Sequence, residues 1–129
     1  MARLEYFLVA ESCSQDINRN SLSVFHILND VRLHEMPGVI HELVAVSGWV
    51  MSDEDIQNQE EFQLRIRFDM PVAEEGRDFR ANLRASTRFQ NHHFWLAEVP
   101  VGQSGDIVVR LFLDDVEKAT HTIAVSHSD

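Results

Sequence analysis

Four aspartates in polar, turn-forming segments are the candidate metal ligands of this sequence. Asp53 and Asp55 follow Ser52, and Asp114 and Asp115 follow an apolar run near the C-terminus. Calcium takes six to eight oxygen ligands, mostly carboxylates and carbonyls, so an end of the molecule rich in such residues could bind it. The sequence contains no Asp-x-Asp-x-Asp-Gly calcium loop. The alternative interpretation, that an acidic protein has acidic loops, therefore stays open.

The histidines are not spaced as a zinc site requires. His92 and His93 are adjacent, so on a strand their side chains would point to opposite faces. His34 and His41 flank a Pro-Gly step, and each precedes a glutamate, which makes at most a partial site. Zinc needs three or four ligands in tetrahedral geometry, and neither an HExxH nor a CxxC spacing supplies them. We therefore predict no cofactor.

Nucleophilic side chains are present, but the sequence places no catalytic base beside them. Ser12, Cys13 and Ser14 fall near the end of an expected strand. A nucleophile needs a positioned base, and neither a Gly-x-Ser-x-Gly elbow nor a phosphate-binding glycine loop occurs. Cys13 is the single cysteine, so an internal disulfide is excluded and a structural thiol is expected. We predict that the protein is not an enzyme.

The two tryptophans, Trp49 and Trp95, are expected to pack in the core or in a hairpin. If either proved exposed with Asn91 and His92 nearby, a surface that stacks against carbohydrate would become credible.

Strands must position all of these residues, because the apolar residues alternate with polar ones. Between Glu61 and Met70 every second residue is apolar, which gives a strand one dry and one wet face. Ser52 with Asp55 resembles a capping box and predicts one helical turn. Eight strand-like segments are separated by turn-forming residues. They span residues 3–12, 21–28, 41–51, 61–70, 78–86, 93–99, 106–114 and 118–126.

This pattern predicts an all-β fold, an antiparallel β-sandwich of about eight strands in a single domain spanning residues 1–129. A small eight-stranded barrel is the alternative. In a sandwich whose strands run end to end, consecutive loops alternate between the two ends. The loops at 13–20, 52–60, 87–92 and 114–117 would then share one end, together with most of the loop acids.

The net charge of −10 repels the phosphate backbone, so we predict no nucleic-acid partner. Five arginines are a local exception and have two interpretations, a solvated sheet face balanced by neighbouring acids or a basic groove. They are Arg65, Arg67, Arg80, Arg84 and Arg88.

Nothing in the sequence resembles a membrane or export signal. Arg3 and Glu5 interrupt the stretch in which a signal peptide would need apolar residues. No run approaches the roughly 20 apolar residues that would span a membrane. We expect a cytoplasmic protein with no membrane partner.

Three segments resemble a bacterial family of small, uncharacterised all-β proteins, a domain of unknown function. They are residues 4–11, 22–25 and 105–114. Many immunoglobulin-like and C2-like sandwiches end with a similar hairpin. The resemblance implies a sandwich and a bacterial origin, and it brings no catalytic residue and no activity.

The function stays unknown at this level, and three hypotheses remain. The first is a non-enzymatic binding or assembly module of a cytoplasmic protein, which uses loops or an exposed edge strand to hold a protein partner or a second copy of itself. The second is a calcium or small-ligand binder that uses the acidic loops. The third, an enzyme, would need a histidine beside a serine, a thiol or a carboxylate pair.

Overall fold

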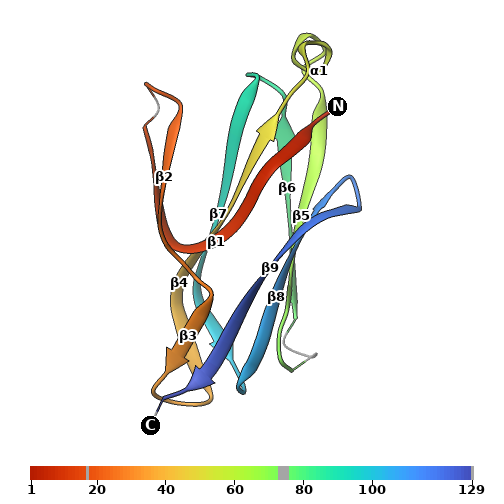
Figure 1. Cartoon of the computed structure of the whole chain (residues 1–129). Coiled ribbons are helices and arrows are strands. Elements are labelled where there is room, and N and C mark those ends of the chain that lie inside the picture. The colour runs from red at the N-terminus through yellow and green to blue at the C-terminus, as the bar shows by residue number, and fades with distance from the viewer. Residues whose placement is uncertain (17, 73–75, 129) are drawn as a thin grey trace.

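A computed structural model describes residues 1–16, 18–72 and 76–128 as two β-sheets and one short helix, α1 (Asp53–Gln57) (Figure 1). The four-stranded sheet contains, in order, β2 (Ser21–Ile27), β1 (Arg3–Asp16), β4 (Gly38–Val50) and β7 (Phe89–Val101). The five-stranded sheet contains, in order, β3 (Asp30–Leu33), β9 (Val116–His127), β8 (Gly105–Leu113), β5 (Glu61–Asp69) and β6 (Arg77–Arg84). Within the described chain both sheets stay open at their edges. The sandwich prediction is therefore confirmed, and the eight-stranded barrel is wrong.

The alternating segment at residues 61–70 forms β5, and its apolar side chains face the core. Phe62, Leu64, Ile66 and Phe68 are each at most 8% exposed. Burial of such a side chain contributes about 1.5–3 kcal/mol, so this strand and its neighbours supply much of the stability. The core role expected for the apolar stripe is confirmed.

The expected capping box is present at the start of α1. The Ser52 hydroxyl accepts a hydrogen bond from the Asp55 amide at 3.1 Å, and the Asp55 carboxylate accepts one from the Ser52 amide at 3.4 Å. Satisfying two otherwise unpaired amides lets five residues form a helix between two long strands. This helix is far too short to cross a membrane, and the described chain contains no other.

Nine strands form where eight were expected, and one pairing is parallel. β3 runs parallel to the end of β9, from Asp30 beside Ala124 to Leu33 beside His127. The chain reaches this position by crossing from one sheet to the other at Leu28 and Asn29. The Leu28 amide bonds to the Val9 carbonyl in the first sheet at 2.9 Å. The next carbonyl, of Asn29, accepts from the Ala124 amide in the second sheet at 2.8 Å.

β1 belongs to two pairings because it changes partner at Ala10. Its first half, Arg3 to Ala10, pairs with β4, and its second half pairs with β2 as a hairpin. Two contacts show that this hairpin lies over the outer face of the four-stranded sheet. Gln15 approaches His93 of β7 at 3.3 Å, and Asn20 donates to the Phe89 carbonyl at 3.0 Å. From Gly38 to Leu43, therefore, no described strand pairs with β4 on the edge where β1 pairs with its later residues.

Candidate functional site

The acidic loops do share one end of the sandwich, as the strand count predicted. Figure 1 shows α1 and the β1–β2, β6–β7 and β8–β9 connections toward the upper end of the molecule. In the described part of the chain, however, no three His, Cys, Asp or Glu side chains group closely enough to hold a metal ion.

Three of the four candidate aspartates at that end have partners of their own. Asp55 pairs with the Met1 amino group; this contact and the hydrogen bonds from Ser52 lower the pKa of the carboxyl, although partial burial acts the other way. The Asp114 carboxylate accepts from the Gln63 amide at 2.9 Å, and Asp115 lies 4.0 Å from Arg65. Asp53 is exposed and lines a separate depression. The calcium hypothesis stays a prediction.

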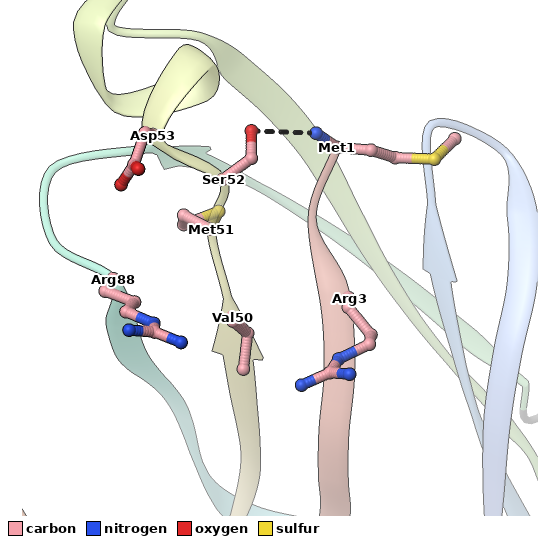
Figure 2. Close-up of a pocket in the computed structure, with 7 residues that line it drawn as sticks. All are labelled: Met1, Arg3, Val50, Met51, Ser52, Asp53 and Arg88. Atoms are coloured by element: carbon pink, nitrogen blue, oxygen red, sulfur yellow. Dashed lines mark hydrogen bonds between the residues drawn. The ribbon is translucent and has the colours of Figure 1, made fainter.

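Figure 2 shows this depression, of about 450 Å³, between the N-terminus and the β6–β7 connection. The guanidinium groups of Arg3 and Arg88 approach from opposite sides and face the space over Val50. Arg3 also bonds to Glu5 at 2.8 Å, whereas Arg88 lies 5.3 Å from the Phe89 ring. Two cations therefore face one open surface of an otherwise acidic protein.

Four of the five notable arginines lie on the outer face of the five-stranded sheet. Arg65 lies 4.0 Å above the Phe112 ring and 3.6 Å from Asp78. Arg67 pairs with Asp69 at 3.1 Å, and Arg84 bonds to Glu61 at 2.5 Å.

Arg80, the fourth of these arginines, donates to the neutral Gln63 amide at 3.1 Å. Three of these four arginines are therefore paired with acids, which favours the interpretation of a face balanced by neighbouring acids over that of a basic groove. Arg88 is the exception, because it lies at the loop end.

The histidines and tryptophans separate between the two faces of the four-stranded sheet. His92 pairs with buried Ser47; burial lowers its pKa, and neighbouring His93 adds to this effect. His93 lies on the other face, as expected. Trp49 is buried and donates to Ser47 at 2.9 Å, whereas Trp95 is 40% exposed.

The arrangement that would have favoured carbohydrate stacking is only partly present. Asn91 shares the outer face of β7 with Trp95, but its amide oxygen accepts from the Tyr6 hydroxyl at 2.6 Å, and His92 lies on the opposite face.

The feature best suited to binding is a groove at the opposite end, between β3 and the first half of β4, which we call the side groove. It consists of two adjoining hollows that share Leu33, Val39 and His41. We call the one of about 330 Å³ the upper hollow and the one of about 490 Å³ the lower hollow. Its apolar lining comes from both sheets and consists of Leu28, Val31, Leu33, Val39 and Ile40. All but Ile40 are half-buried.

The side groove exists because β1 leaves β4 at Val44. From Gly38 to Leu43, β4 has a neighbour in β7 and none on its other side in the described chain. β3 is likewise an edge strand, since β9 is its single partner among the described strands. Two free strand edges therefore flank an apolar floor, and unpaired backbone groups beside such a floor can accept another strand.

Carboxylates form the rim of the upper hollow. Glu11, at the bend of β1, and Glu42, on β4, are both exposed, and no described cation lies within ion-pair distance of either. His41 lies 3.4 Å from Glu98. The lower hollow has a mixed rim of Arg32, His34 and Glu35.

His34 and His41, expected to flank one loop, do meet at this groove. The groove itself was missed, because the four-residue strand β3 leaves almost no periodic signal. The divergence of β1 from β4 is a tertiary event that a single sequence does not show.

Comparison with known proteins gives a fold relative and no family. No family model and no curated protein matches the sequence. The structure is similar to that of the Pseudomonas fluorescens alkylpurine DNA glycosylase AlkC bound to DNA containing an abasic site analog, with a TM-score of 0.60 and 8% identity. The match covers 96% of this chain but 30% of the glycosylase chain. At this identity the similarity concerns the fold alone.

Proposed function

We propose that the protein is a non-enzymatic binding module that holds an extended segment of a partner protein in the side groove. The observation that supports this proposal is the missing neighbour of β4 from Gly38 to Leu43, directly beside an apolar floor. An extended peptide added at a sheet edge gains main-chain hydrogen bonds, while alternate side chains enter pockets. Six residues of β4 offer about 20 Å for such pairing.

Two of the other sheet edges, β6 and β7, are less suited to this task. β6 carries four charged side chains in eight residues, Arg77, Asp78, Arg80 and Arg84, and charges on an edge discourage pairing. β7 carries one charge, Glu98, but its Phe89 carbonyl already accepts from Asn20. The side groove combines a free edge with a concave apolar surface.

A non-enzymatic role is supported by the state of the one thiol. Burial raises the pKa of Cys13, which lowers the fraction of nucleophilic thiolate at neutral pH.

Selection of peptides from a random display library on the immobilised protein tests the proposal. We expect the selected peptides to bind wild type and to shift amide resonances of β3, of residues 38–43 and of the β1 bend. Val39→Lys places a charge on the floor and should weaken binding at least tenfold. Val116→Lys is the matched control, because Val116 is 56% exposed and belongs to β9.

Thermal unfolding of both variants verifies that they are folded. Failure to select any binder, or binders whose affinity is unchanged in Val39→Lys, would contradict the proposal.

A second candidate function is binding of nucleic acid at the depression of Figure 2. The observation that favours it is the pair Arg3 and Arg88 facing one space. Arg88 also lies 5.3 Å from the exposed Phe89 ring, on which a base could stack. The glycosylase that shares this fold was solved with DNA. The net charge of −10 and Asp53 in the same depression oppose the idea.

Fluorescence anisotropy with a labelled single-stranded oligonucleotide, at about 50 mM salt where phosphate contacts are strongest, tests it. Binding that weakens with salt and is lost in the Arg3→Gln/Arg88→Gln double variant, but is kept in Arg32→Gln at the other end, would support this function. Absence of binding at low salt would exclude it.

A further inference from the structure

We infer that the segment held in the side groove is cationic, with lysine or arginine alternating with apolar residues; this inference rests on the proposed function. The carboxylates of Glu11 and Glu42 stand at the rim of the upper hollow, above an apolar floor. The floor specifies the apolar residues of the segment, and the rim specifies the charge of the others.

The alternation follows from strand geometry. Successive side chains of an extended segment point to opposite sides, so one set can contact Val31, Val39 and Ile40 while the other set stays near the rim. Glu11 lies on β1 and Glu42 on β4, so the two acids approach the segment from different strands. Because neither has a cation within reach in the described chain, a basic side chain would displace no existing ion pair.

The cationic residues should lie toward the upper hollow. The lower hollow already contains a cation, Arg32, beside Glu35 and His34, and is closer to neutral. Basic residues placed there would meet Arg32, whereas those placed between Glu11 and Glu42 meet only acids and the His41–Glu98 pair.

A separate partner fits better than a second copy of this chain. Two copies would each bring a net charge of −10, which opposes association. A basic segment is instead attracted by the overall field as well as by the rim, and its binding should weaken as salt screens both.

Three peptides of equal length test the inference, with valine alternating with lysine, glutamine or glutamate. Affinities are measured by amide-resonance titration at low and high salt. We expect the lysine peptide to bind about tenfold more tightly than the glutamine peptide, and the glutamate peptide to bind most weakly. The Glu11→Gln/Glu42→Gln variant should lose most of this preference and keep only the part that the overall negative charge supplies. Glu54→Gln, an exposed acid at the opposite end, should retain it.

Charge reversal sharpens the test, since Glu11→Lys/Glu42→Lys should prefer the glutamate peptide. Equal binding of the three peptides in the groove would overturn the cationic chemistry and leave the proposed function standing. If library selection yields no groove binder, the proposed function itself fails. A dimer in sedimentation that is lost in Val39→Lys would replace the peptide with a second copy and overturn the inference.

Discussion

Gly48 lies in the centre of β4, and the ring of Tyr6 covers it. A Cβ at position 48 would overlap three atoms of that ring. Tyr6 in turn donates its hydroxyl to Asn91 at 2.6 Å, so the absent side chain, the ring and the amide form one contact across β1, β4 and β7. Glycine at this position serves close packing.

We predict that Gly48→Ala destabilises the protein by about 1–3 kcal/mol, since the ring must leave its place and overpacking carries a cost of this size. Tyr6→Phe removes only a hydrogen bond and should cost about 1 kcal/mol. Denaturant unfolding measures both. In the double variant Gly48→Ala/Tyr6→Ala the overlap is absent. Its loss of stability should therefore be smaller than the sum of the losses in the single variants Gly48→Ala and Tyr6→Ala, and strict additivity would contradict this explanation.

His92 is a second residue whose surroundings matter, because burial changes the pKa of its imidazole. Its Nδ1 is buried and has no hydrogen-bond partner among the described residues, and burial lowers its pKa. A histidine with a pKa lower in the folded than in the unfolded state takes up its proton mainly on unfolding. Acid therefore favours the unfolded chain.

The resulting pH dependence has a definite sign. Stability should fall as the pH drops below the unfolded value of about 6.5, and it should be unaffected by His92 above that value. We predict that His92→Leu flattens the stability profile between pH 7 and pH 5, measured by denaturant unfolding. His93→Gln should retain most of the slope. An unchanged slope in His92→Leu would show that another group is responsible.

At the scale of the elements, the crossing between β2 and β3 links the two sheets. His121, on β9, donates from Nε2 to the Leu28 carbonyl at 2.6 Å, at the point where the chain changes sheets. Two backbone hydrogen bonds beside this contact join the crossing to opposite sheets. The Leu28 amide donates to Val9 in the first sheet, and the Asn29 carbonyl accepts from Ala124 in the second. The side chain of His121 thus holds the crossing against the second sheet.

We predict that His121→Ala lowers the free energy of unfolding by about 1 kcal/mol. It should also accelerate hydrogen exchange at Leu28 and along β3 more than in β4 or β8, because β3 has only four paired residues. Thr122→Ala, an exposed neighbour on β9, is the control. Uniform acceleration across both sheets would indicate global destabilisation instead.

The long elements could be predicted from the sequence, and the short crossing could not. The alternation at residues 61–70 and 107–113 identified β5 and β8, because each strand is buried on one face and repeats with a period of two. β4 was recognised from its apolar content. β3 was missed, since Asp30–Leu33 has only two apolar residues and its pairing with β9 joins distant parts of the chain.

At the scale of the whole molecule, the candidate site was harder to predict than the fold. Counting strands placed the acidic loops at one end, but it could not show that Asp55, Asp114 and Asp115 have partners there. The side groove depends on β1 changing partner at Ala10, which no local pattern encodes.

The side groove has one further consequence, because its walls belong to different layers. Val31 and Leu33 come from the five-stranded sheet, and Val39 and Ile40 from the four-stranded sheet. Any occupant therefore contacts both sheets at once and links them. Pulling the layers apart would have to expel it, so a partner held here would make the sandwich mechanically stiffer as well as thermodynamically more stable.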